Sequence, residues 1–192
     1  MSTKEKILEE SLRLFSISGF EAVSIRAIAE AVGVSSGALY KHFSSKSDIF
    51  DAIVDKCKQD YLDAIAKNTK DITSKAAVIE VCLGSFNYQT TNTQIVQFRR
   101  MLMLEQFRNP KVAALYKEFF VDIPIHSQMD IFSKLMKNGF MKKADPKVCA
   151  MELYAPFYLY HFVQEDVASL QPLFQKHIDE FVAHYGLGAN FK

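Results

Sequence analysis

The chain has 192 residues, 49% of them hydrophobic, and its formal net charge at pH 7 is only +1. This length and apolar content allow a sizeable core in one compact unit or two small domains, and they argue against a disordered chain. The nearly balanced charge excludes a uniformly basic nucleic-acid-binding protein, so any contact with DNA must come from a local patch.

The sequence also argues against a membrane span, a secretion signal and a β-sheet. The apolar runs are too short to cross a bilayer and the amino terminus lacks the apolar stretch of a signal peptide, so we expect a cytoplasmic protein with no membrane partner. No segment alternates apolar and polar residues for long, which predicts an all-α fold. The cysteines, Cys57, Cys82 and Cys149, form no Cys-x-x-Cys pair, which favours reduced thiols; we expect no metal and no cofactor.

In chain order, the first clear signal is a pair of short helices joined by a turn. The apolar face of the first helix carries Ile25, Ile28, Ala29 and Val32. Ser24 can cap its free amides. Gly33 should end it, because such a turn commonly needs a positive φ, which only glycine adopts without steric cost, and Val34 can fill the corner that follows.

The second helix of the pair is short and has distinct inner and outer sides. Ser35 or Ser36 can cap it, while Leu39 and Phe43 stand at i and i+4 and should point inward. The outer side combines bare backbone with side chains able to reach phosphate or base edges: Gly37, Ala38, Tyr40, Lys41 and His42. The pair is therefore expected to be a DNA-binding helix-turn-helix, although ordinary helical hairpins also carry Ala, Gly and Val at such spacing.

The positive charge of this region is concentrated on the expected contact surface. Within residues 24–46 there are three cationic side chains, Arg26, Lys41 and Lys46, and only one acidic side chain, Glu30. We expect the DNA-contacting residues to be Ser24, Arg26, Ser35, Ser36, Gly37, Ala38, Tyr40, Lys41, His42 and Lys46. Arg26 and the segment 36–41 should contact bases in the major groove, whereas Ser24, Tyr40, His42 and Lys46 should hold the DNA backbone.

The first fifty-odd residues carry a dense pattern of specific residues. These are Ile7, Leu8, Leu14, Phe15, Gly19, Phe20, Ile28, Ala29, Ala31, Val32, Gly33, Val34, Ser35, Gly37, Leu39, Tyr40, His42, Phe43 and Lys46. In identity and spacing they resemble the tetracycline-repressor (TetR/AcrR) family of transcriptional regulators. The resemblance implies a three-helix helix-turn-helix domain joined by a long helix to a helical ligand-binding and dimerisation domain. It also implies a ligand-responsive repressor that a small apolar or aromatic effector releases from a palindromic operator.

Beyond the motif, the spacing of apolar residues predicts a series of longer helices. A connecting helix should cover 48–67, so we assign residues 1–47 to the DNA-binding domain and 48–192 to the second domain, with a break at 68–74. Further helices are expected at about 75–91, 93–107, 110–138, 146–165 and 171–185. Pro124 should kink or break the third of these, and Pro156 should kink the fourth.

The segment 95–107 is apolar around most of its circumference, so it should be a central helix. Aromatic and methionine side chains abound near it, and the resemblance implies a small-molecule cavity in the second domain. The candidate ligand-binding residues are Phe98, Met101, Leu102, Glu105, Phe107, Tyr116, Phe120 and Phe157. Plain core packing stays open as the alternative, and Glu105 could anchor a cationic group or pair with Arg99 or Arg108.

The last two helices are more apolar than one contact with a core requires. The resemblance implies that they form a four-helix interface in a homodimer. The candidate interface residues are Leu153, Phe157, Tyr160, His161, Phe174, Ile178, Phe181, Val182 and Tyr185. Packing within the subunit stays open as the alternative for each of them.

Two rival functions are weaker. His161 and Glu165 stand at i and i+4, but the sequence has no His-Glu-x-x-His motif, nucleophile elbow or phosphate-binding loop, so we do not expect an enzyme. A helix-turn-helix regulator controlled by a protein partner would need a large exposed apolar surface in place of an enclosed cavity. We therefore expect a homodimeric, ligand-responsive repressor bound to double-stranded operator DNA, with activation in place of repression left open.

Overall fold

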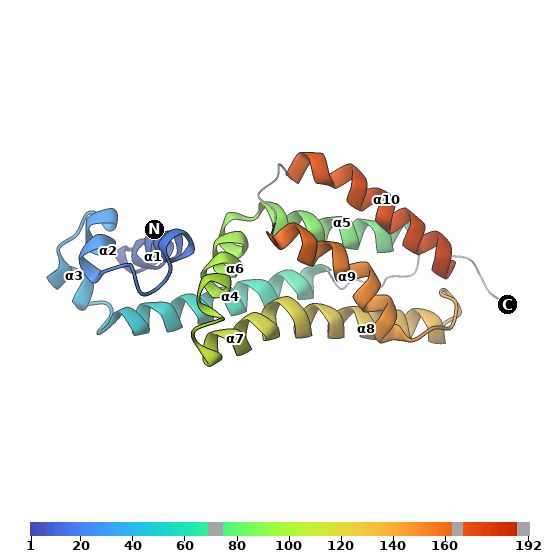
Figure 1. Ribbon diagram of the computed structural model, residues 1–192, viewed down its shortest axis with the longest axis horizontal. Coiled ribbons are helices and arrows are strands. Elements are labelled where there is room, and N and C mark those ends of the chain that lie inside the picture. Colours follow the sequence, from blue (N-terminus) through green and yellow to red (C-terminus); the bar gives the residue numbers. More distant parts are fainter. Residues whose placement is uncertain (69–74, 163–166, 188–192) are drawn as a thin grey trace. The chain divides into compact units, whose positions relative to one another are not determined.

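The computed structural model describes residues 1–68, 75–162 and 167–187, and in these ranges all regular secondary structure is helical (Figure 1). The helices are α1 Thr3–Ser18, α2 Ile25–Val32, α3 Ser36–Tyr40, α4 Lys46–Asn68, α5 Lys75–Thr91, α6 Thr93–Glu105, α7 Pro110–Lys117, the π-helical turn η1 Glu118–Asp122, α8 Ile123–Lys137, α9 Pro146–Phe162 and α10 Val167–Tyr185. The predicted all-α class is confirmed. Among the described residues, no helix is both long and apolar enough to cross a membrane.

The chain forms two compact units. The head unit comprises residues 1–64 and 93–118, and the body unit comprises 65–92 and 119–192. Helices α6 and α7 thus belong with the helix-turn-helix, whereas the sequence suggested a division after residue 47. That functional division stays a prediction, and the break expected at 68–74 falls almost wholly outside the described residues.

Helix α1 anchors the head unit. A capping box starts it: the Ser2 hydroxyl accepts the Glu5 amide at 3.2 Å, and Glu5 Oε2 accepts the Ser2 amide at 2.6 Å. The helix packs against α2 and α6. The fully buried apolar side chains of the head include Ile7, Phe15, Ile28, Leu39, Ile49, Phe98, Met101 and Leu102. Segments that are distant in sequence therefore share one core, and α6 supplies part of it.

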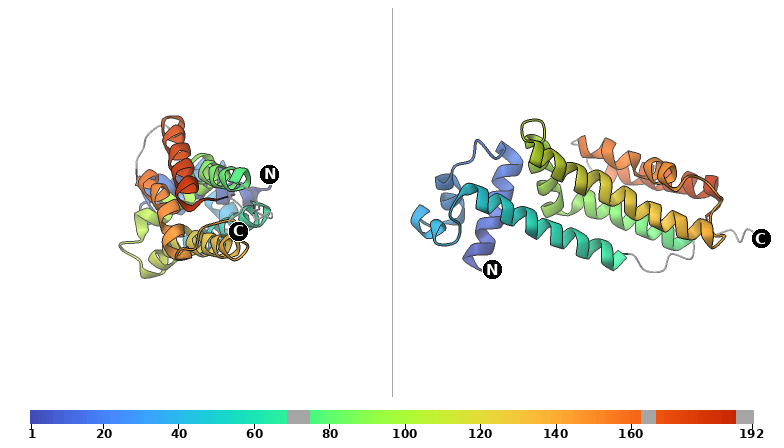
Figure 2. Two further views of the ribbon diagram at one scale, coloured as in Figure 1. Left: turned by 90° about the vertical axis from the view of Figure 1, so that its right-hand side faces the viewer. Right: turned by 90° about the horizontal axis from the view of Figure 1, so that it is seen from below.

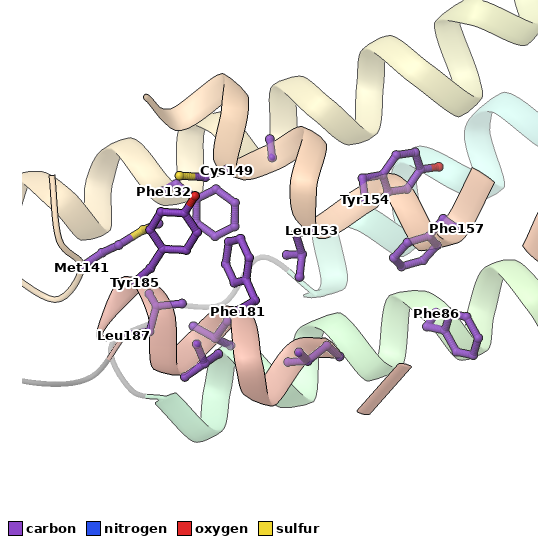
Figure 3. Close-up of a cluster of buried hydrophobic side chains, with 14 of the residues drawn as sticks. Phe86, Phe132, Met141, Cys149, Leu153, Tyr154, Phe157, Phe181, Tyr185 and Leu187 are labelled. Carbon is purple, nitrogen blue, oxygen red and sulfur yellow. The ribbon is translucent and has the colours of Figure 1, made fainter. Parts of the chain in front are cut away.

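The body unit is a helical bundle with an aromatic core. Figure 2 shows α5, α8, α9 and α10 running alongside one another; α8 packs on α9, and α10 packs on α5 and α9. Phe86 of α5 stacks on Phe174 of α10 with ring centroids 4.1 Å apart. Farther along the core, Phe132 of α8 lies against Phe181 of α10, at 5.5 Å between centroids (Figure 3). Apolar burial on this scale supplies most of the stability of such a bundle.

The helix expected over 110–138 is continuous from 110 to 137, but its hydrogen bonding changes at the π-helical turn η1, which separates α7 from α8. Pro124 lies in the first turn of α8, directly after η1, and has no N–H to donate there. A complete break at this proline, one of the two outcomes expected, is therefore absent, and the irregularity is the π-helical turn before it. Pro156 instead lies inside α9, and α10 begins at Val167, earlier than the sequence indicated.

Candidate nucleic-acid interface

Helices α2 and α3 form the predicted helix-turn-helix, and each begins at a serine cap. The Ser24 hydroxyl accepts the Ala27 amide at 3.1 Å, and the Ser35 hydroxyl accepts the Ala38 amide at 3.1 Å. Capping by Ser24 is confirmed, and of the two candidates for the second helix the structure selects Ser35. Each hydroxyl keeps its own hydrogen, so both remain able to donate to a phosphate oxygen.

The turn between the two helices depends on Gly33. Its φ of 78° and ψ of 34° lie in the left-handed region, which confirms the positive φ expected there. The Gly33 amide donates to the Glu30 carbonyl at 3.1 Å, and the Val34 amide donates to the Ala29 carbonyl at 2.9 Å. These bonds satisfy the last carbonyls of α2 and set the angle at which α3 leaves.

Helix α3 separates inner from outer residues as its spacing predicted. Leu39 and Phe43 are buried, whereas Tyr40 is 53% exposed. The predicted DNA-contacting residues that are exposed are Ser24, Arg26, Ser35, Gly37, Tyr40, Lys41 and His42, and the partly exposed ones are Ser36, Ala38 and Lys46. Helix α3 and the turn after it thus present a phenol, an ammonium and an imidazole beside a nearly bare backbone, which suits close approach to a groove.

Lys46 has a position that the sequence did not indicate. Its ammonium nitrogen donates to the carbonyl oxygens of Phe20 at 2.6 Å, Val23 at 3.0 Å and Glu21 at 3.3 Å. It also lies 4.3 Å from the centroid of the Phe20 ring. An ammonium has three donors, and three carbonyls take them, so the geometry favours a structural role for Lys46 over the expected phosphate contact.

Replacing Lys46 by methionine should lower the free energy of unfolding by about 1 to 2 kcal/mol, since hydrogen bonds from a charged donor to the backbone are lost. The salt dependence of DNA binding should stay unchanged, because no phosphate contact disappears. Urea unfolding and operator titrations at several salt concentrations would measure both. Lys41→Met is the matched control: it should keep stability but reduce the salt slope by about 0.9. If Lys46→Met reduced the salt slope by a similar amount, Lys46 would contact a phosphate after all.

The candidate ligand-binding residues are divided between the two units. Phe98, Met101, Leu102, Glu105, Phe107 and Tyr116 belong to the head unit, and Phe120 and Phe157 belong to the body unit. All are buried except Phe107, which is 89% exposed, so Phe107 lines no enclosed site in this conformation. Two grooves, of about 450 Å³ between α1, α4 and α6 and about 490 Å³ between α9 and α10, are lined by other residues. The ligand-binding role of these eight residues stays a prediction.

Glu105 has a partner that sequence reasoning missed. Its Oε1 atom accepts the backbone amide of Phe20 at 2.9 Å. The sequence suggested that Glu105 anchors a cationic ligand or pairs with Arg99 or Arg108, and neither expectation includes this bond. The two residues are 85 positions apart, so no local pattern could have indicated it.

The candidate dimer-interface residues all lie in the core of the single chain. Leu153, Phe157, Tyr160, His161, Phe174, Ile178, Phe181, Val182 and Tyr185 are each at most 8% exposed. Their packing is within the subunit, which is the alternative that the sequence left open, and their role in an interface stays a prediction. Among the side chains that the structure describes in α9 and α10, the large apolar ones left exposed are Val148, Met151, Leu159, Phe162 and Leu173.

The thiol of Cys57, in the head unit, is not suited to redox chemistry. Cys57 is buried in the head unit, and burial raises the pKa of its thiol to about 11. The thiol therefore stays protonated at neutral pH, and a protonated thiol is a poor nucleophile.

Residues 7–53 match the family model for bacterial regulatory proteins of the tetR family. The nucleoid occlusion factor SlmA of Enterobacter sp. (strain 638) is 28% identical over 156 residues, which are 79% of this chain and 77% of SlmA. The match to the family model covers α2, α3 and the caps described above.

Two solved structures share the fold over nearly the whole chain. SmeT, the repressor of the Stenotrophomonas maltophilia multidrug efflux pump SmeDEF, has a TM-score of 0.71 at 20% identity, over 100% of this chain and 96% of SmeT. The complex of SmeT with triclosan has a TM-score of 0.67 at 20% identity, over 96% of this chain and 92% of that chain. At such identities, the likeness extends to the fold and not to the ligand.

Proposed function

Because this chain belongs, by its amino-terminal domain and its fold, to the tetR family of bacterial regulatory proteins, we propose that it is a homodimeric repressor released from its operator by a small apolar effector. The observation that carries the proposal is the helix-turn-helix, in which Leu39 and Phe43 are buried while Tyr40, Lys41 and His42 are exposed. Regulators with this motif place the second helix in the major groove.

The exposed residues make two kinds of contact. Arg26 and the exposed residues of the segment 36–41 contact base edges, and Gly37 allows the backbone of α3 to approach the groove closely. Lys41, at the end of this segment, also reaches a phosphate. Ser24, Ser35, Tyr40 and His42 contact phosphates, which fixes the position of α3 along the duplex. Lys46 supports the loop before α2, as its hydrogen bonds indicate.

Arg26→Ala should relax the sequence preference at one operator position, at a cost of about 1 to 3 kcal/mol if the guanidinium is bidentate to guanine. The side chain is exposed at the start of α2, so its removal should leave folding unchanged. Titration against a set of single-base operator variants would measure the effect. An equal loss on every variant would make Arg26 a backbone contact instead.

The dimer is proposed to form through α9 and α10, on the faces that carry Met151, Leu159, Phe162 and Leu173. Large apolar side chains that stay exposed in one chain commonly mark an interface. A two-fold axis would then pair two recognition helices, so the operator should be a near-palindrome with half-sites about one turn of DNA apart, or a multiple of it.

Selection of operator fragments from genomic DNA tests the proposal directly. A repressor should protect a two-fold symmetric site near a promoter, and deletion of its gene should raise the corresponding transcript. Activation would instead lower that transcript. If no DNA sequence were selectively protected, the protein would be neither a specific repressor nor a specific activator.

Effector binding and operator binding should oppose each other by the same factor. Because SmeT, which shares this fold, forms a complex with triclosan, a panel of apolar aromatic compounds beginning with triclosan is a suitable first set. For any compound that binds, calorimetry should find a weaker affinity for the operator-bound dimer than for the free dimer. Equal affinities would mean that the compound does not control DNA binding.

The similarity to SlmA favours a second candidate, a DNA-binding nucleoid occlusion factor. The two functions differ in how their sites are distributed. A local repressor should occupy few chromosomal sites close to promoters, whereas many sites spread over the chromosome would favour the second candidate. Chromatin immunoprecipitation with sequencing distinguishes them.

A further inference from the structure

Phe20, in the loop between α1 and α2, is held by three helices of the head unit. Its amide donates to Glu105 of α6 at 2.9 Å, and its carbonyl accepts from Lys46 of α4 at 2.6 Å. Its ring lies between Phe15 of α1 and Phe50 of α4, with centroids 5.3 Å from each. Both main-chain groups and the side chain are thus fixed at once, by contacts that are distant in sequence.

The contact with Glu105 requires a glycine at position 19. Gly19 has a φ of 79°, and a Cβ atom built on it would lie 2.9 Å from Glu105 Oε1, closer than real Cβ contacts allow. Any side chain at this position would push the carboxylate away from the Phe20 amide. Glu105 itself is only 6% exposed, so little solvent competes for this charge-assisted hydrogen bond.

The loop that contains Phe20 leads directly into the helix-turn-helix. The carbonyls of Glu21 and Val23 accept from the same Lys46 ammonium that binds Phe20, so the loop is held as one piece. Val23 is followed at once by Ser24, the cap of α2. A displacement of Phe20 therefore has a short and rigid path to α2, and through the Gly33 turn to α3.

Helix α6 follows one of the three points at which the chain passes between the two units; the others lie within α4, after residue 64, and at the start of η1, after residue 118. The chain leaves the body unit after Asn92, forms α6 and α7 in the head unit, and returns to the body unit at Phe119. A rearrangement of the body that moves the start of α6 acts directly on a helix of the head core. Its last residue is Glu105.

We propose that Glu105 is a positioning residue through which α6 sets the placement of α2 and α3; the inference rests on the proposed DNA-binding function. A shift of α6 moves the Glu105 carboxylate, the carboxylate moves the Phe20 amide, and the loop carries the change to the recognition pair. The long helix α4 need not swing for the signal to pass. Operator binding should in turn be felt at the end of α6, because coupling between sites is reciprocal.

The first test uses amide hydrogen exchange and NMR spectra of the full chain without DNA. The Phe20 amide should be protected in the unaltered protein, exchange at least about 10-fold faster in Glu105→Ala, and stay near the original rate in Glu105→Gln, which keeps an acceptor oxygen. The resonances of Ala27 and Ala38 should shift in Glu105→Ala only. If they do not move while Phe20 is released, the contact is local and the proposal is overturned.

Two further variants separate positioning from simple destabilisation. Glu105→Asp keeps the charge but shortens the side chain by one methylene, so its carboxylate should not reach the Phe20 amide. It should therefore show the same fast exchange of Phe20 as Glu105→Ala, and it replaces that variant if the alanine protein folds poorly. Glu118→Ala is the matched control: it removes another head-unit carboxylate, which pairs with Lys58 at 2.9 Å, and should leave Phe20 protected. An unprotected Phe20 amide in the unaltered protein would overturn the proposal without any variant.

The second test adds the operator fragment selected from genomic DNA. Glu105→Ala and Glu105→Asp should bind it at least about 10-fold more weakly than Glu105→Gln and Glu118→Ala do. Operator should slow exchange at Gln106 and Asn109, whose amides bond to the last turn of α6, in Glu105→Gln but not in Glu105→Ala. Equal slowing in both would overturn the proposed route. If the unaltered protein selects no operator, the proposed function fails, and the first test still decides whether Glu105 positions α2 and α3.

Discussion

Replacing Tyr40 by alanine should weaken operator binding by about 100-fold or more while leaving thermal stability unchanged. Tyr40 ends α3 and is 53% exposed, whereas the nearby Leu39 and Phe43 are buried. A hydrogen bond from its phenol to a phosphate contributes about 1.5 kcal/mol or more, roughly tenfold in affinity. A dimer carries two such contacts, so the factors multiply.

The matched control removes another exposed aromatic ring from the same unit. Phe107→Ala, at a site 89% exposed in the turn after α6, should keep full operator affinity. Electrophoretic mobility shifts with the selected operator, together with thermal melts of each variant, would separate contact from folding. A Tyr40→Ala protein that binds as tightly as Phe107→Ala would remove Tyr40 from the interface, and a lowered melting temperature would assign it to the core.

The predictions that succeeded depend on short sequence separations. The serine caps, the positive φ of Gly33 and the inward direction of Leu39 and Phe43 all follow from residues within four positions of each other. Local hydrogen bonds and the helical repeat determine such features, whatever surrounds them. The helix-turn-helix could therefore be located residue by residue before any tertiary contact was known.

Long-range geometry decides the roles that the sequence did not indicate. Lys46 follows a serine run at the start of α4, a suitable place for a phosphate contact, yet its ammonium binds the loop of Phe20. Glu105 was expected to anchor a ligand or to pair with Arg99 or Arg108, yet it accepts an amide 85 residues away. A charged side chain on a long stem can satisfy either a ligand or a backbone group, and only the packing selects between them.

The same limit applies to the faces of α9 and α10. Both helices are apolar around much of their circumference, so spacing cannot distinguish the side that packs within the subunit from the side left for a partner. Phe181 was a reasonable interface candidate on sequence grounds, but it is 6% exposed and packs on Phe132. Leu159, on the neighbouring helix, is 65% exposed.

This difference gives the two residues opposite expected phenotypes when each is changed to aspartate. Phe181→Asp places an unpaired charge in the subunit core, so it should yield unfolded chains. Leu159→Asp leaves that core intact and should yield folded monomers, because a charge would be buried only when two copies meet. Light scattering gives the mass of each variant, and circular dichroism shows whether it is folded.

The loss of the dimer in Leu159→Asp should cost more operator affinity than any single contact residue. A dimer binds two half-sites with linked heads, and separating them removes an avidity of about 10² to 10⁴. Phe107→Asp is the control for the added charge, because it introduces the same aspartate at an exposed position of the head unit. It should stay dimeric and bind the operator normally, which would show that the position of the charge matters and not the change in net charge. A Leu159→Asp protein that remained a dimer with undiminished operator affinity would exclude this face of α9 and α10, whose groove is lined by Leu159, Leu173 and His177, from the interface. The two recognition helices would then have to be spaced by another surface of the chain, and the exposed apolar side chains of these helices would need a different occupant.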